Sequence, residues 1–136
     1  MEFPDQGETI SINSPQSVVQ YLLGELREYH QEVFLTIYLN TKYDIICCEE
    51  IFKGTLDRSI AHPRDVFRRA VHHNAHSIII AHTHPSGDLT PSMEDARMTA
   101  RFAEAGKLLS IPVLDHIIFS YQCPMSYYSF REEQRI

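Results

Sequence analysis

The sequence predicts a three-layer domain of the α/β or α+β class, in which a mixed central β-sheet is packed by helices. Helical and strand patterns alternate along the chain. Residues 77–81 are apolar without alternation, which is typical of a central strand covered on both faces. At 136 residues, 43% of them hydrophobic and 22% charged, the chain fits one globular domain with a sizeable core. We expect this domain over residues 14–136, with residues 1–13 as an N-terminal arm or an added edge strand.

The first half of the chain predicts one helix and a hairpin. Ser14-Pro15 marks the helix start, because proline is tolerated in the first turn, and apolar residues recur at helical spacing to near residue 29. Residues 33–39 and 45–52 are rich in β-branched and aromatic types and flank a turn. We therefore expect two paired strands there.

The second half predicts two more helices and three strands. A helix begins at His62-Pro63 and extends to about residue 75, followed by the apolar strand at 77–81. The longest helix is expected from residue 92 to about 109. Strands are expected at residues 113–119 and 126–130.

Two histidines and an aspartate around the 77–81 strand predict a metal site. His82 and His84 are one residue apart at the end of a strand, so their side chains point the same way. Ser92 signals a helix start, and Asp95 falls in the first turn of that helix, where it can fold back. Two imidazoles and one carboxylate leave a fourth tetrahedral position for water, as in catalytic zinc sites. The predicted cofactor is therefore Zn²⁺, held by His82, His84 and Asp95.

These residues also carry a resemblance to a known family. A glutamate, then His-Thr-His-Pro, seven residues and Ser-x-x-Asp together resemble the JAMM signature of the JAB/MPN metalloprotease superfamily. Residues 49–55, 62–64, 84–88 and 114–118 are similar to the RadC branch in particular. The similarity covers roughly residues 14–130 and implies the cytidine-deaminase-like architecture of JAMM proteins.

The resemblance also implies roles for two more residues. Glu32, which precedes an apolar strand as the general base of the superfamily does, would take a proton from water and pass it to the leaving group. Glu50 is the alternative base. Ser92 would help to hold the oxyanion, although the same serine is an ordinary helix cap. Asp95 has a rival role too, because Ser92-x-x-Asp95 resembles a capping box, and we expect the metal role to compete with the cap.

The chain departs from the RadC pattern in two ways. Thr83 stands between the paired histidines, where the branch usually has asparagine, but that position is expected to point away from the metal. Many RadC-like proteins also carry an N-terminal helix-hairpin-helix region, whereas about thirteen residues precede the first helix here. No DNA role is expected from such a region.

Charge and the lack of targeting signals bear on whether the protein binds nucleic acid or a membrane. The formal charge of -6 and the lack of a long basic run argue against a nucleic-acid-binding protein. Arg64, Arg68 and Arg69 are interpreted as a solvated helix face. The chain shows no export signal and no apolar run long enough to cross a membrane, so we expect a cytoplasmic protein. The sequence predicts no oligomeric state.

The remaining cysteines and histidines are interpreted as structural. Cys47, Cys48 and Cys123 lack metal-binding or disulfide spacing, so we expect reduced packing residues. A cluster near a helix end, His72, His73 and His76, needs no ligand role. His116 is expected to be a hydrogen-bonded core histidine outside the site.

Together these observations predict a zinc-dependent hydrolase of an amide-type bond, and the JAMM likeness suggests a peptide or isopeptide in a protein substrate. Two alternatives stay open: a non-catalytic MPN-type interaction module, and a RadC-like DNA-repair accessory protein. A nucleobase deaminase is excluded, because its H-x-E and P-C-x-x-C elements are missing.

Overall fold

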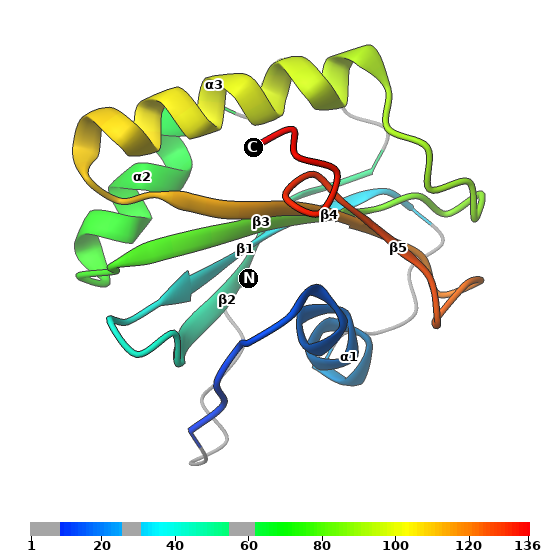
Figure 1. The fold of residues 1–136 in the computed structure, drawn as a ribbon, viewed down its shortest axis with the longest axis horizontal. Helices are drawn as coiled ribbons and strands as arrows, with labels where there is room; N and C mark the ends of the chain where they lie inside the picture. Colours follow the sequence, from blue (N-terminus) through cyan, green and yellow to red (C-terminus); the bar gives the residue numbers. More distant parts are fainter. Residues whose placement is uncertain (1–8, 26–30, 55–61) are drawn as a thin grey trace.

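The structure, a computed structural model, describes residues 9–25, 31–54 and 62–136, and its elements follow the predicted order (Figure 1). The predicted end of the first helix, near residue 29, and most of the N-terminal arm lie outside the described residues. The described elements are α1 (Pro15–Glu25), β1 (Val33–Leu39), β2 (Ile45–Lys53), α2 (Pro63–His72), β3 (Ser77–Thr83), α3 (Met93–Leu109), β4 (Val113–Phe119) and β5 (Tyr127–Ser129).

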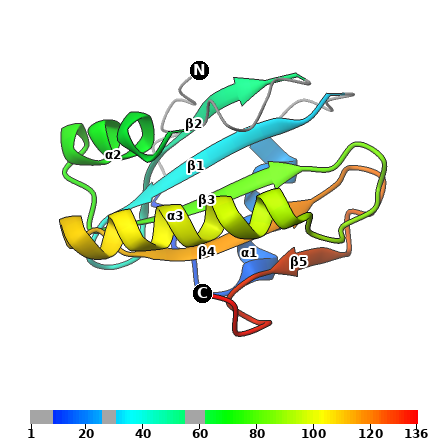
Figure 2. The same ribbon diagram turned by 90° about the horizontal axis from the view of Figure 1, so that it is seen from above.

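The five strands within the described ranges form one mixed sheet in the order β2-β1-β3-β4-β5. β1 is antiparallel to both β2 and β3, β3 is parallel to β4, and β4 is antiparallel to β5. Helices α2 and α3 cover one face of this sheet and α1 covers the other, as Figures 1 and 2 show. The predicted three-layer fold with a mixed central sheet is therefore confirmed.

Each face of the sheet has its own hydrophobic core. Under α2 and α3 the core includes Phe34, Phe67 and Phe102, and under α1 it includes Leu22 and Ile79. Every residue of β1 and of β3 is buried, which confirms that residues 77–81 belong to a strand covered on both faces. No helix in the described part of the chain is long and apolar enough to cross a membrane.

Several element ends differ from the sequence prediction by a residue or more, and two of these differences affect the position of histidines. β3 continues to Thr83, because its parallel pairing with β4 extends to Phe119, so His82 lies inside the strand. α2 ends at His72 rather than near residue 75, because Asn74 adopts a left-handed conformation with φ of 53°. Of the predicted arm, Ser11 makes an isolated antiparallel bridge with Asp44.

Gly106 lets α3 pack closely against the loop that leads into β4. A Cβ atom at this position would lie 2.5 Å from the carbonyl oxygen of Ile111 and 3.3 Å from atoms of Phe67 and Val113. A contact of 2.5 Å with backbone cannot be relieved by a side-chain rotation. The glycine therefore fixes the distance between α3 and the end of the sheet.

We predict that Gly106→Ala lowers the free energy of unfolding by about 1–3 kcal/mol, the usual cost of overpacking a filled site. Gly24→Ala is the matched control, because it is also a glycine in a helix and its added Cβ would meet nothing within 4 Å. That control should be neutral or stabilising by up to ~1 kcal/mol. Urea unfolding measures both, and equal effects of the two substitutions would contradict the role given to Gly106.

Candidate metal centre

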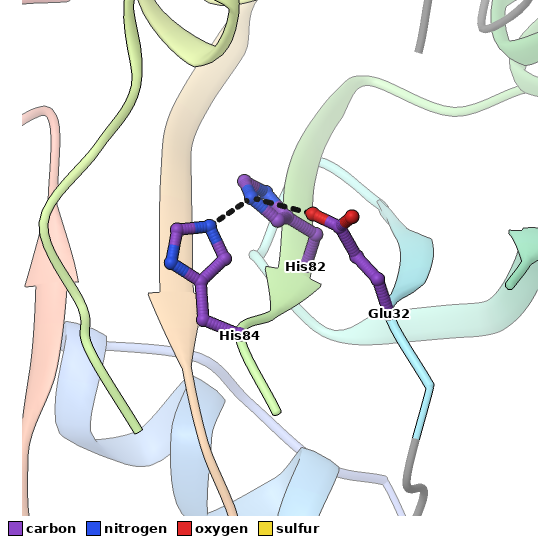
Figure 3. A group of neighbouring side chains, drawn as sticks. All are labelled: Glu32, His82 and His84. Carbon is purple, nitrogen blue, oxygen red and sulfur yellow. Dashed lines mark hydrogen bonds and ion pairs between the residues drawn. The ribbon is translucent and has the colours of Figure 1, made fainter. Parts of the chain in front are cut away.

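His82 and His84 lie at the end of β3, on the face of the sheet that α3 covers. His82 lies opposite Phe34 of β1 and Ile118 of β4, and is 1% exposed. His84 follows directly after the strand and points toward His82 (Figure 3), with the two Nε2 atoms 2.8 Å apart. The alternation of side chains along a strand explains why residues two apart meet.

Thr83, between the two histidines, uses its side chain on the opposite side of the strand. Its hydroxyl accepts a hydrogen bond from the backbone N–H of Val33 at 2.9 Å and donates to the carbonyl oxygen of Gln31 at 3.4 Å. These bonds tie the segment that carries Glu32 to the end of β3. The threonine therefore points away from the histidine pair, as the sequence predicted, and helps to position Glu32.

Asp95 in the first turn of α3 brings a carboxylate to both imidazoles. Its Oδ1 lies 3.3 Å from His82 Nε2 and its Oδ2 lies 3.5 Å from His84 Nε2, and the residue is fully buried. Ligand atoms on a tetrahedral zinc ion, with bonds of about 2.0–2.1 Å, are about 3.4 Å apart. Both contacts of the carboxylate have about this separation, whereas the two Nε2 atoms, 2.8 Å apart, would have to move apart to share an ion. The chemistry of the donor set fits such an ion.

Hydrogen bonds behind the histidines fix which ring nitrogen carries the proton. The Thr99 hydroxyl donates to the Asp95 carbonyl oxygen at 2.8 Å, so it accepts from His116 Nδ1 at 2.5 Å. The other nitrogen of His116, Nε2, must then accept from His82 Nδ1, 2.8 Å away. This order leaves the lone pair of His82 Nε2 directed at Asp95 and His84, as a metal ligand needs.

The loop after β3 orients His84 in the same way. Its Nδ1 donates to the carbonyl oxygen of Asp88 at 2.7 Å, which leaves Nε2 as the coordinating atom. Gly87 in this loop has a positive φ of 85°, a conformation that glycine adopts without strain. The side-chain amide of Gln122 donates to the carbonyl oxygen of Pro85, so the turn after β4 holds the loop in place.

Glu32 lies at the edge of this cluster, just before β1. Its Oε1 is 3.7 Å from His82 Nε2, and Glu32, His82 and His84 form a group of side chains that could hold a metal ion (Figure 3). The alternative base, Glu50, lies opposite Leu35, which in turn lies opposite Ala81. Since Ala81 and His82 point to opposite faces, Glu50 projects to the α1 side of the sheet. The structure therefore brings Glu32, and not Glu50, to the histidines.

Burial and mutual contacts shift the pKa values of the cluster. Burial lowers the pKa of His82 below its ordinary value, although Asp95 opposes this. Burial also acts to lower the pKa of His84, but its hydrogen bonds with Asp95 and Asp88 outweigh burial and raise it. Burial acts to raise the pKa of Asp95, but the two histidines outweigh it and hold that pKa well below its usual range. A neutral His82 beside an ionised Asp95 suits metal binding, whereas the raised pKa of His84 means that an ion must displace a proton there.

Asp95 forms the capping box that the sequence offered as its rival role, and it also lies against both histidines. The Ser92 N–H donates to Asp95 Oδ2 at 2.8 Å, and the Asp95 N–H donates to the Ser92 hydroxyl at 3.0 Å, which completes a capping box. The same carboxylate faces both histidines, because Oδ1 lies toward His82 while Oδ2, which accepts from the Ser92 N–H, lies toward His84. The cap thus holds Asp95 in the orientation that reaches His82 and His84.

Sequence reasoning placed His116 outside the site, and the structure places it directly behind His82. It is fully buried and hydrogen-bonded, as expected, but one of its partners is His82 itself. Phe130 stacks on its ring at 4.8 Å between centroids and fixes the ring plane. Only the pairing register of β3 with β4, which the sequence does not contain, could have revealed this contact.

Comparisons with known proteins agree with the fold. The chain matches the RadC-like JAB domain family over residues 12–135. A UPF0758 protein of Caldanaerobacter subterraneus subsp. tengcongensis is 50% identical over 113 residues, which make up 83% of this chain and 48% of that protein. A UPF0758 protein of Enterococcus faecalis is 48% identical over 122 residues, or 90% of this chain and 51% of the relative.

This chain therefore belongs to the RadC-like JAB domain family, the RadC-like branch of the JAB/MPN superfamily, as the sequence motifs predicted. It spans about half the length of the curated relatives that it matches.

The Ser92 cap allows a test of the local structure. We predict that Ser92→Ala lowers the free energy of unfolding by about 1 kcal/mol, because the Asp95 N–H loses its acceptor. Ser92→Asn should retain most of that stability, since asparagine caps helices as well as serine does and Ser92 is exposed. Thermal or urea unfolding in the presence of a chelator measures the difference. Equal losses in the two variants would show that the cap contributes little.

Proposed function

We propose that this domain is a zinc-dependent hydrolase that cleaves an amide-type bond. The observation that supports it most is the convergence of His82, His84 and Asp95. Glu32 lies beside them, with its Oε1 3.7 Å from Nε2 of His82. Three ligands with a non-ligand carboxylate beside them are the donor set of a hydrolytic rather than a structural zinc site. A bound zinc ion would lower the pKa of water and polarise the carbonyl of the substrate.

Proton transfer, stabilisation of the oxyanion and orientation of His82 would then fall to residues of the chain. Glu32 would take the proton from the attacking water and give it to the departing amine, which is general base and then general acid catalysis. Ser92 would donate a hydrogen bond to the oxygen that becomes negatively charged, because a hydroxyl that accepts from a backbone N–H can also donate. His116 and Thr99 would keep His82 in the coordinating tautomer.

The substrate class is a peptide or isopeptide bond in a protein. The JAMM-type arrangement of residues supports this class, and the acidic balance of -6 disfavours nucleic acid. The names of the matched relatives state no activity, and the chain spans about half their length, so the proposal concerns this domain. An MPN-type interaction module or a DNA-repair accessory protein would need no zinc at His82, His84 and Asp95, so the zinc per chain that is lost in His82→Ala with His84→Ala separates these functions from hydrolysis.

We predict that Glu32→Gln lowers kcat for a peptide or isopeptide reporter by about 10²–10⁴-fold, the usual contribution of a general base, without loss of zinc. Glu50→Gln is the matched control and should keep full activity, because Glu50 projects to the other face of the sheet. The readouts are initial rates and zinc per chain. Activity that survives both Glu32→Gln and chelation would overturn the mechanism.

The hydrogen bonds behind His82 give a second prediction. Thr99→Val, which removes the hydroxyl at nearly constant volume, should weaken zinc binding about 10-fold, and His116→Leu should weaken it by up to about 100-fold. Thr99→Ser keeps the hydroxyl and should bind zinc as the unmodified chain does. Competition with a chromogenic chelator measures the dissociation constants. Unchanged affinity in Thr99→Val and His116→Leu would show that the histidines need no support from this network.

A further inference from the structure

A second polar cluster lies between β2 and α2, on the same face of the sheet as the candidate metal centre. Cys47 and Glu49 are two residues apart on β2, so both point toward α2, and His73 reaches them from the end of that helix. Two side chains from β2 thus meet one from the end of α2, much as His82 and His84, at the end of β3, meet Asp95 of α3. β2 is the edge strand of the sheet.

The three side chains present one donor atom each at close range. Cys47 Sγ lies 3.3 Å from His73 Nε2 and 3.9 Å from Glu49 Oε1, and His73 Nε2 lies 2.6 Å from the same carboxylate oxygen. A thiolate, an imidazole and a carboxylate are all zinc ligands, with bonds of about 2.3, 2.0–2.1 and 2.0–2.2 Å. Cys47 is 7% exposed and Glu49 is 9% exposed, so the donors are largely screened from water.

Arg69 and Tyr38 complete the surroundings of this cluster. Arg69, which the sequence placed on a solvated helix face, instead points its Nε at Glu49 Oε2, 3.1 Å away, and so turns Oε1 toward Cys47 and His73. The ring of Tyr38 lies 5.1 Å from that of His73, and its fully buried hydroxyl has no hydrogen-bond partner within the described ranges. Burial, and then the charge of Glu49, raise the pKa of Tyr38.

A buried hydroxyl without a partner is costly, and such atoms are often explained by an unseen water or ion. Here the hydroxyl belongs to a side chain whose ring packs beside that of His73, tilted by 42°. The hydroxyl of Thr36, two residues earlier on the same face of β1, is also without a partner among the described residues. These two hydroxyls can satisfy one another, so support for a ligand comes from the three donor atoms and their burial.

We propose that Cys47, Glu49 and His73 form a second metal site, which takes a thiophilic divalent cation such as Zn²⁺ and clips α2 to the edge strand β2. Binding releases the thiol proton of Cys47, so that a thiolate, a carboxylate and a neutral imidazole surround the ion. The ion pair between Arg69 and Glu49 remains, because it uses the other carboxylate oxygen.

This site is separate from the candidate metal centre. On β1, Tyr38 lies opposite Cys47 and Phe34 lies opposite His82. Four residues along a strand correspond to about 13 Å. The two ions would therefore share no ligand, and each site can be emptied without touching the other.

The test uses cobalt as a spectroscopic probe in the full chain carrying His82→Ala and His84→Ala. A thiolate-to-cobalt charge-transfer band in the near ultraviolet should rise to a plateau at one Co²⁺ per chain and disappear when Zn²⁺ is added. The band reports this site alone, because the candidate metal centre has no sulfur ligand. Failure of the proposed hydrolase would leave this result unchanged.

Matched substitutions identify the ligands. In the same background Cys47→Ser should abolish the band, whereas Cys48→Ser should keep it, because Cys48 lies in the core under α1. His73→Ala should weaken cobalt binding, whereas His72→Ala, at an exposed position one residue earlier, should not. No saturable band, or a band that persists in Cys47→Ser, would overturn the proposal.

Thermal unfolding gives a readout that does not depend on the spectrum. Zinc should raise the Tm of the His82→Ala, His84→Ala chain, because a ligand that binds the folded state stabilises it. Addition of Cys47→Ser should remove that rise, and addition of Cys48→Ser should not. A zinc-induced rise of equal size in both would place the metal elsewhere.

Discussion

The parallel pairing of β3 with β4 is the constraint on which the candidate metal centre depends. Parallel neighbours cannot be joined by a tight turn, so the chain must cross the sheet between them, and α3 is that crossover. The crossover begins where β3 ends, which places the first turn of α3 beside the last residues of the strand. Asp95 meets His82 and His84 for this reason, and Gly106 at the other end of α3 lets the chain return closely to the sheet.

Burial determines the chemistry of Asp95, His82 and His84. In water a carboxylate and two imidazoles would be solvated separately, whereas here Asp95 is fully buried, with Oδ1 beside His82 and Oδ2 bonded to the Ser92 N–H. The cap and the histidines hold the carboxylate ionised, and the order of hydrogen bonds from Thr99 through His116 sets the tautomer of His82. The helix cap thus orients the carboxylate toward the two histidines.

Local patterns in the sequence were sufficient for the elements and for most of the proposed donors. The apolar run before His82 predicted a central strand. Strand and helix geometry then predicted that the side chains of His82, His84 and Asp95 lie close together. The extension of β3 to Thr83 could not be predicted, because it depends on how far β4 offers partners.

Contacts across the sheet were missed for the same reason. His116 reaches His82 from another strand, and His73 reaches Cys47 and Glu49 from the C-cap of α2, one residue before Asn74 with its positive φ. Periodicity shows which face a residue occupies, but only the register between elements shows which residue it meets. The preference for Glu32 over Glu50 came from the family likeness, and the strand register gives it a physical basis.

The distribution of the proposed catalytic groups along the chain has a consequence for the denatured state. His82, His84 and Asp95 lie within one short stretch, so an unfolded chain could still chelate a cation weakly, and this would reduce the stabilisation that the cation gives to the native fold. Glu32 comes from a distant segment and joins the others only when β1 docks against β3. A partly folded chain could therefore bind a metal ion and still be inactive. Hydrolysis would begin only after β1 pairs with β3 and brings Glu32 to the histidines.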